Sequence, residues 1–293
     1  MRYFPAPYPD EILGSLLIRA CHHLGLSPRG LVHYLDDGWG EFSFVYPSFF
    51  QGISRLTRIP AEILLTEHTV FPYVAIGMTT PRRRVLESDW LTAPAHGNSL
   101  RLRAALGLHI DELALRRYCP QCCDEDYRCI GESYWHRRHM LPGVFICPKH
   151  GEPLLVSSTS VLPKLTTESA KLPQEVSGQP YSWGLDENGM RCLAAAVEEA
   201  MSLPAQTWSN MYSDAPASSV VKTRKYSNGD VDPMLMQFCR FYGTEFLRKM
   251  GLSLQTLDSD GWPSRMMRGA RPSVLRPLRH ILLRLFLLSS IFS

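Results

Sequence analysis

Two short cysteine and histidine motifs constrain this chain more than any other feature. One reads Cys-Pro-Gln-Cys at 119–122 and the other Cys-Pro-Lys-His at 147–150. Each motif separates two metal-binding residue types by two positions, which is the spacing of a zinc knuckle. Buried cysteines and a surface histidine rarely produce two such pairs by chance. We therefore expect a closed, structural zinc site with no position for water or substrate, held by Cys119, Cys122, Cys147 and His150.

The remaining cysteines indicate a reducing compartment. Of eight cysteines in 293 residues, three belong to the zinc set. The others are expected to be free thiols: Cys21, Cys123, Cys129, Cys192 and Cys239. Free thiols beside a zinc-thiolate site are typical of the cytoplasm. The first residues have no apolar signal-peptide core, and the apolar run 281–292 is too short to span a bilayer. We expect a cytoplasmic protein without a membrane segment.

Hydrophobic periodicity predicts a mainly α fold with an N-terminal helical unit. Asp10 is expected to cap a first helix that Gly25 ends, and Ser27 to begin a second. Two more short helices are predicted over 49–56 and 60–67. Their tight connection resembles a helix-turn-helix, although any small helical bundle gives the same pattern. His68 beside Glu67 fits a structural hydrogen bond better than acid–base chemistry, because no nucleophile accompanies the pair.

The rest of the chain divides by composition. Helices are predicted over 100–115, 132–140, 187–201, 233–250 and 273–288, and a short strand over 144–146. Trp135 is expected to pack under the zinc site. Stretches rich in Ser, Thr and Pro at 157–180 and 202–219 indicate irregular loops. We expect a helical domain at 1–115, a zinc module with minimal β structure at 116–156, a linker at 157–182 and a helical domain at 183–293.

Charge is uneven although the net charge is only +3. The segment 261–293 contains no Asp or Glu and six arginines, namely Arg265, Arg268, Arg271, Arg276, Arg279 and Arg284. We expect them on the exposed side of the last helix, where they favour a nucleic-acid backbone. Pairing with the carboxylates of a partner protein and plain solvation are the alternatives. The cluster Arg82–Arg84 is expected to be solvated.

Three groups of residues resemble the TniQ/TnsD family of transposon target-selection proteins. The N-terminal group contains the aromatic and proline lead-in at 4–8, Glu11, Ser15 and Arg19. The middle group is 67–72, and the third combines both zinc motifs with Tyr134, Trp135, Arg137 and His139. Trp262 and the segment 277–280 resemble the closing helical part of the family. The resemblance is strong from 1 to 155 and loose beyond.

The resemblance implies an adaptor rather than an enzyme. Members identify the insertion site and recruit an AAA+ transposition regulator of the TnsC type, which engages the transposase. Some read attachment-site DNA directly, and others ride on a CRISPR RNA-guided Cascade complex, often as a dimer. Direct readers are usually longer at the C-terminus, so the length favours the Cascade-coupled form, with direct attachment-site binding as the alternative. A zinc hydrolase or nuclease fits poorly, because a closed quartet offers no metal-bound water.

The N-terminal lead-in is a candidate contact for the AAA+ regulator. Tyr3, Phe4 and Tyr8 alternate with prolines in an extended apolar segment. Exposed aromatic residues of this kind mark partner surfaces. The alternative is that they pack back on the first helix.

Overall fold

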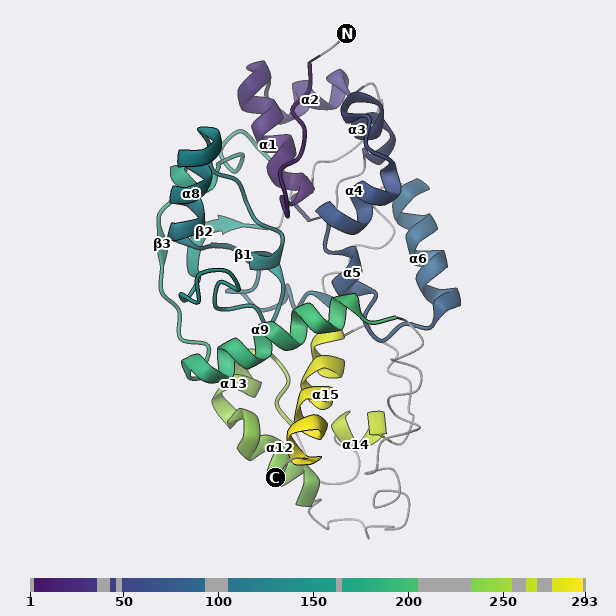
Figure 1. The fold of residues 1–293 in the computed structure, drawn as a ribbon, viewed down its shortest axis with the longest axis vertical. Coiled ribbons are helices and arrows are strands. Elements are labelled where there is room, and N and C mark those ends of the chain that lie inside the picture. The colour runs from purple at the N-terminus through teal and green to yellow at the C-terminus, as the bar shows by residue number, and fades with distance from the viewer. Residues whose placement is uncertain are drawn as a thin grey trace.

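The computed structural model describes residues 3–35, 43–45, 49–92, 105–161, 165–204, 233–254, 262–267 and 276–291. Helices dominate these ranges, which confirms the mainly α class, and a small sheet lies among them (Figure 1). The elements in chain order are α1 Leu13–Leu24, α2 Pro28–Tyr34, α3 Phe50–Thr57, α4 Ala61–His68, α5 Phe71–Val74, α6 Thr80–Thr92, β1 Leu115–Tyr118, α8 Pro120–Ile130, η1 Arg138–Met140, β2 Leu155–Ser160, η2 Pro173–Glu175, β3 Gly178–Gln179, α9 Glu187–Ser202, α12 Pro233–Tyr242, α13 Thr244–Lys249, α14 Trp262–Met267 and α15 Pro277–Ile291.

The N-terminal helices follow the sequence pattern closely. Gly25 ends α1 in the left-handed conformation, and its N–H bonds to the last carbonyls of the helix. The Ser27 hydroxyl accepts a hydrogen bond from the Gly30 N–H at 3.1 Å and so caps α2. The prediction that Asp10 caps α1 is wrong. Ile12 is the N-cap residue, and Asp10 itself adopts φ 56° and faces another part of the chain.

The middle of the chain departs from the predicted elements. The described part of the predicted helix 100–115 consists mostly of turns that lead into β1. Only η1 is helical in the predicted helix 132–140, and the predicted strand 144–146 is reduced to an isolated bridge between Ile146 and Pro153. These stretches make only isolated turns of their own, and other backbone groups in them bond to distant segments, as when the Arg137 N–H donates to the Asp10 carbonyl and the Val161 N–H donates to the Ala114 carbonyl. The helix α8, by contrast, has no counterpart among the elements predicted from the sequence.

The sheet has the strand order β1-β2-β3, and both pairs are antiparallel. Val156 of β2 lies opposite Arg117 on one side and Gln179 on the other. The predicted linker 157–182 therefore carries most of β2, all of η2 and β3, and the buried side chain of Leu172. Its Ser-rich composition hides this role because these strands are short and half exposed. A side chain at Gly178 would collide with the Tyr118 ring at 2.7 Å.

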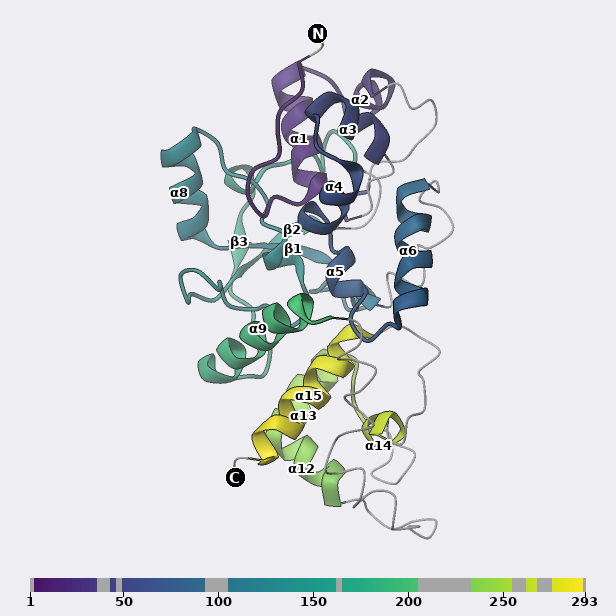
Figure 2. The same cartoon turned by 45° about the vertical axis from the view of Figure 1, so that its right-hand side comes forward.

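The C-terminal helices pack under the sheet and α5 (Figures 1 and 2). Gly243, with φ 76°, splits the predicted helix 233–250 into α12 and α13. The helix α9 contacts both α5 and α15. The main apolar core of the described residues runs from α1 through the zinc-motif region to α15, and a small second cluster joins Met266 of α14 to Leu283 of α15. Within the described ranges, no helix combines the length and apolar character needed to cross a bilayer. The second predicted loop, 202–219, lies almost entirely outside the described residues.

Candidate metal centre and the contacts that hold it

The first pair of candidate ligands sits at the beginning of α8. Cys119 is the N-cap residue with extended backbone, Pro120 occupies the first helical position, and Cys122 follows in the first turn. Proline suits this position because a backbone N–H there would have no hydrogen-bond partner within the helix, so its absence costs nothing. The positive end of the helix dipole also favours thiolate over thiol. Local sequence thus brings two sulfurs to one helix end.

The second pair lies on a tight turn. The Gly151 N–H donates to the Cys147 carbonyl at 2.8 Å, and the Cys147 N–H donates to the Glu152 carbonyl at 2.7 Å. Gly151 has φ 71°, and a Cβ there would lie 2.4 Å from the Arg191 guanidinium. The turn consequently requires glycine. It directs Cys147 and His150 toward the start of α8.

The four side chains converge as predicted, with all donor atoms within 4.8 Å of one another. The sulfurs of Cys122 and Cys147 are 3.6 Å apart. His150 Nδ1 lies 3.4 Å from the sulfurs of Cys119 and Cys122 and 3.6 Å from that of Cys147. A tetrahedral zinc site has edges of about 3.8 Å between sulfurs and about 3.6 Å between sulfur and nitrogen, from its usual bond lengths. The donor set and its dimensions both fit zinc.

A carboxylate orients the histidine of this cluster. His150 Nε2 donates to Glu125 Oε1 at 3.0 Å, which leaves Nδ1 free to face the sulfurs. Lys149 forms an ion pair with the other oxygen of Glu125. Carboxylate–histidine pairs of this kind fix the tautomer of a metal-binding imidazole. The sequence analysis missed Glu125, although its position near the middle of α8 is one turn beyond Cys122.

The electrostatics of the cluster favour a cation at its centre. Hydrogen bonding to Cys119 is the main cause that lowers the pKa of the Cys147 thiol and raises the pKa of Cys122. Three thiols this close cannot all ionise beside one another, because their negative charges repel. A divalent cation removes that repulsion.

Two further histidines, His136 and His139, lie in the segment between the two cysteine and histidine motifs. His136 Nε2 lies 2.9 Å from Asp126 Oδ2. His139 is buried, and burial lowers its pKa, so the ring is neutral. Neither belongs to the four-donor cluster.

A buried ion-pair network joins α1 to the segment that follows α8. Arg19, which is 1% exposed, donates to Glu11 Oε2 at 2.6 Å and to Glu132 Oε1 at 2.9 Å. Its guanidinium also lies 3.8 Å from the centre of the Tyr8 ring, and the Tyr8 hydroxyl donates to Glu132. Burial raises the pKa of Glu11 to about 7, against the opposing charge of Arg19. Arg19 lies on α1, whereas Glu11 precedes the helix and forms an isolated bridge with His136, so the ion pair fixes the start of α1 against its lead-in.

Backbone and side-chain hydrogen bonds reinforce the same joint. The Ile12 N–H donates to the Trp135 carbonyl at 3.1 Å, and the Trp135 N–H donates to the Ser15 hydroxyl at 2.9 Å. Arg137 donates to Asp10 Oδ1 at 3.1 Å and to the Thr66 carbonyl at 2.6 Å. We call these contacts between 8–19 and 132–139 the joint. Whether the boundary at 115/116 separates independent domains stays a prediction.

Other polar residues singled out from the sequence are structural. His68 Nδ1 lies 2.9 Å from the Glu11 carbonyl, as the hydrogen-bonding interpretation predicts. Trp135 is fully buried, and its ring meets Phe44 and Tyr118 edge to face. Tyr118 directly precedes the ligand candidate Cys119, so Trp135 packs between the N-terminal unit and the cluster.

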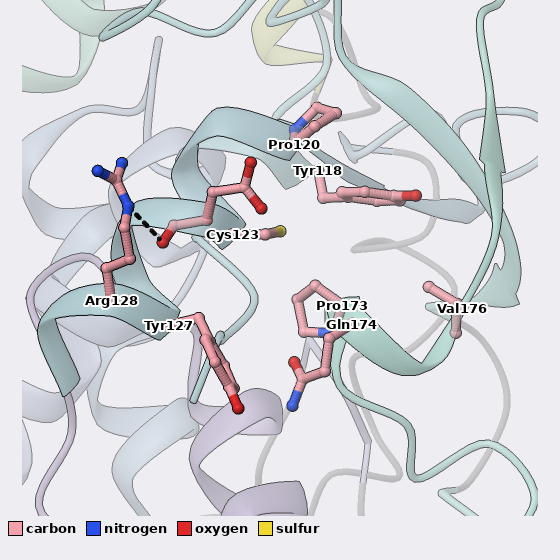
Figure 3. Close-up of a pocket in the computed structure, with 9 residues that line it drawn as sticks. Tyr118, Pro120, Cys123, Tyr127, Arg128, Pro173, Gln174 and Val176 are labelled. Carbon is pink, nitrogen blue, oxygen red and sulfur yellow. Dashed lines mark hydrogen bonds between the residues drawn. The ribbon is translucent and has the colours of Figure 1, made fainter. Parts of the chain in front are cut away.

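A cavity of about 610 Å³ lies beside the cluster, between α8 and η2 (Figure 3). Tyr118, Cys123, Tyr127 and Pro173 line it, and Arg128 turns back to donate to the Asp124 carbonyl at 3.2 Å. Neither histidine nor lysine occurs among the described residues of its wall. Its ionisable side chains are those of Tyr118, Cys123, Asp124, Tyr127 and Arg128.

The C-terminal arginines do not share one environment. Arg284 forms a bidentate ion pair with Glu199 of α9, with distances of 2.9 and 2.7 Å. Arg279 is half-buried, and its guanidinium lies 5.0 Å from the centre of the Trp262 ring. The expectation that all of them line an exposed face without a nearby acid is therefore wrong for these two. Arg265 is exposed and Arg276 is half-buried, whereas Arg268 and Arg271 lie outside the described residues.

The N-terminal aromatic residues mostly pack back on the protein. Phe4 is buried, and Tyr8 lies between Arg19 and Tyr134. Tyr3 remains 58% exposed, with its hydroxyl 2.9 Å from His23 Nδ1. The premise of an unburied segment thus holds for Tyr3 alone among the three.

This geometry defines a class of protein. It is mainly helical, it contains a closed Cys₃His cluster, and buried charged residues connect the region of that cluster to the first helix. The sequence profile of the TniQ family matches residues 2–154, more than half of the chain. The chain belongs to the TniQ family. It is 32% identical over 164 residues to "Transposon Tn7 transposition protein TnsD" of Escherichia coli. That alignment covers 52% of this chain and 31% of the relative, so the chain spans about a third of the relative's length.

Proposed function

We propose that this protein is a non-catalytic adaptor that helps to select the target site of a transposon. Membership of the TniQ family and the similarity to a Tn7 transposition protein support the role. The observation that carries it is the joint, because the buried network connects the N-terminal segment to the cluster entirely within the family-matched range. A rigid scaffold that presents surfaces to several partners is what an adaptor requires.

Structural zinc completes this proposal. Cys119, Cys122, Cys147 and His150 would hold the ion, and Glu125 would orient His150. The ion would fix the start of α8 against the 147–151 turn. All four tetrahedral positions would be filled by protein atoms, so the metal would support the fold rather than act on a substrate.

We further propose that the adaptor links a CRISPR Cascade complex, guided by its RNA, to the AAA+ transposition regulator, and that it acts in the cytoplasm. The exposed side of α4 supports this form. Glu62 and Glu67 both point to solvent there, with Ile63 between them. In a helix-turn-helix, α4 would enter the major groove, where two carboxylates would be repelled by the phosphates. Sequence reading by a guide RNA removes the need for such a helix.

Direct binding of attachment-site DNA is the second candidate. The 32% identity to TnsD over 164 residues supports it. A direct reader places side chains on base edges, and each mismatch costs about 1–3 kcal/mol. An adaptor carried by Cascade shows no such sequence preference.

The contact with the AAA+ regulator is proposed at the N-terminal aromatic segment of Tyr3, Phe4 and Tyr8. The exposure of Tyr3 supports it, and Phe4 and Tyr8 would hold the segment in place from behind. Tyr3→Ala should weaken recruitment of the regulator without changing stability. Unchanged recruitment in a pull-down would remove this segment from the interface.

A pull-down of the purified protein separates the two candidates. One arm offers Cascade loaded with guide RNA, and the other offers attachment-site DNA with a scrambled duplex as its control. The proposal expects retention by Cascade and equal, weak retention by both duplexes. Retention by the attachment site alone would replace the Cascade-coupled form with the direct reader. Retention by neither would contradict the adaptor role.

A further inference from the structure

Two groups of arginines that are far apart in the sequence lie on one flank of the molecule. Arg82–Arg84 occupy the first turn of α6, whereas Arg265 lies on α14 and Arg276 directly precedes α15. Both views show the start of α6, the short α14 and the start of α15 on the same side (Figures 1 and 2). We call these five residues the arginine flank.

A direct contact brings the two groups together. The His280 ring in the first turn of α15 packs on Gly77, where an added Cβ would lie only 2.6 Å from His280 Nε2. Gly77 has φ 78° and belongs to the short connection between α5 and α6. Arg82 follows Gly77 by five positions in the chain, which limits the distance between their Cα atoms to about 18 Å. Arg276 lies four positions before His280, so the contact holds Arg82 and Arg276 in the same region of the molecule.

Among the described residues these five arginines form no ion pair, as is also true of exposed arginines elsewhere such as Arg29 and Arg240; the five differ from those in lying close to one another (Figure 1). Among the described residues, no carboxylate forms an ion pair with Arg82, Arg83, Arg84, Arg265 or Arg276, and Glu87 on the next turn of α6 makes none with the triplet. Burial lowers the pKa of the neighbouring Arg279 to about 10, and the charges of Arg276 and Arg265 add to that lowering. Like charges gathered in this way repel one another until an anion binds.

We propose that the arginine flank binds the phosphate backbone of a nucleic acid. Its cations lie on α6, on α14 and directly before α15, which suits an extended chain of phosphates better than a single anion. Duplex DNA carries one charge per about 1.7 Å of axis, so a duplex lying along these helices presents several phosphates to them. Arginine also binds phosphate in a bidentate manner. The inference deepens the proposed adaptor role by naming the polyanion that the chain itself contacts.

Charge reversal tests this surface without disturbing the core. The double variant Arg82→Glu/Arg84→Glu changes two exposed side chains on α6, a helix with no buried residue among its thirteen. Arg276→Glu changes the second group. Arg83 and Arg279 are left intact because they stack on Phe71 and Trp262. Arg29→Glu on α2, also exposed but at the other end of the molecule, is the matched control.

Binding is measured between 50 and 200 mM salt with a 30-base-pair duplex of arbitrary sequence, a single-stranded RNA and polyglutamate as probes. For Arg82→Glu/Arg84→Glu, loss of two phosphate contacts should make the slope of log affinity against log salt concentration for duplex DNA shallower by about 1.8. Between 50 and 200 mM salt, the affinity of this variant should therefore fall about 12-fold less than that of the unmodified protein. Arg276→Glu should reduce the slope by about 0.9. Arg29→Glu should leave it unchanged. The duplex and RNA arms show which nucleic acid binds better.

Several results would overturn the inference. Absence of nucleic-acid binding by the unmodified protein, or equal slopes in all variants, would do so. An equal effect of Arg29→Glu would show a general charge effect instead of a site. A change confined to polyglutamate would assign the flank to an acidic protein. A transposition assay with and without the protein tests the adaptor role separately. Its result does not depend on whether the arginine flank binds nucleic acid.

Discussion

The joint and the arginine flank use the same side chain in opposite ways. In the joint, Arg19 is almost fully buried and bonds to both Glu11 and Glu132. On the arginine flank, Arg82 and Arg84 are exposed and form no ion pair among the described residues. A buried arginine with two carboxylates stabilises one arrangement of the chain, whereas an exposed arginine without any is available to a partner. Burial and partners, not residue type, distinguish scaffold from binding surface.

Loss of a candidate metal ligand should have the largest effect on the stability of the scaffold to which the joint belongs. Cys122→Ser removes one of four donors at the start of α8. Structural zinc contributes on the order of 10 kcal/mol to the folding of a small module, so the 115–161 region should unfold and zinc content should fall to zero. Metal analysis and circular dichroism measure both changes.

Cys123→Ser is the matched control for that substitution. Cys123 is the next residue of α8, but its sulfur faces the cavity instead of the cluster (Figure 3). The variant should keep one zinc and an unchanged fold. If both variants behave alike, the cluster has no metal-binding role.

Breaking the joint should have the next largest effect. Arg19→Ala leaves Glu11, which is fully buried, without its cation, and this costs about 3–5 kcal/mol in the free energy of unfolding. Chemical denaturation measures the loss. Arg29→Ala, at an exposed position, should change the value by less than about 0.5 kcal/mol. Equal effects would mean that the joint is no stronger than a surface contact.

The pH dependence of stability reports on the same network. Burial raises the pKa of Glu11 to about 7 from an ordinary value of 4.5. Glu11 therefore binds a proton on folding between these values, and its contribution is complete below pH 4.5 and lost as the pH rises through 7. From pH 5 to 8, the unfolding free energy should fall by up to about 3 kcal/mol relative to Glu11→Gln. Parallel curves for the two proteins would contradict the raised pKa.

The smallest change in stability is expected for a substitution of Arg284. This residue also tests whether the arginine flank extends along α15. Its pair with Glu199 is partly exposed, so Arg284→Ala should cost about 0.2–1 kcal/mol in unfolding free energy. The salt slope for duplex DNA should not change, since its charge is already paired. A reduced slope would extend the arginine flank along α15.

The parts of the fold that sequence predicts are those determined by local signals. Gly25 and Ser27 mark helix boundaries through their own backbone and hydroxyl chemistry, and the cluster follows from two fixed spacings. The segment 132–140 carries no such signal. It bonds to α1 and its lead-in more than 110 positions away, so only tertiary structure decides its conformation.

The candidate surfaces show the same division. The ligands are predictable because each pair is local, whereas Glu125 is identified only when the turn at 147–151 meets α8. In the sequence, Arg82–Arg84 look like an ordinary solvated cluster. Only the structure shows that α15 packs on Gly77 and so brings a second group of arginines near them. Arg284 looks unpaired in a segment without acids, yet its carboxylate partner comes from α9.

Native hydrogen exchange before and after zinc removal by a chelator tests the central claim most directly. The account predicts that amides of 115–161 and of α1 lose protection together, because the joint connects them. Amides of α12 should stay protected, since Phe238 and Tyr242 pack on α15. Loss confined to the 147–151 turn, or no loss at all, would contradict a zinc-dependent scaffold that includes the N-terminal helix.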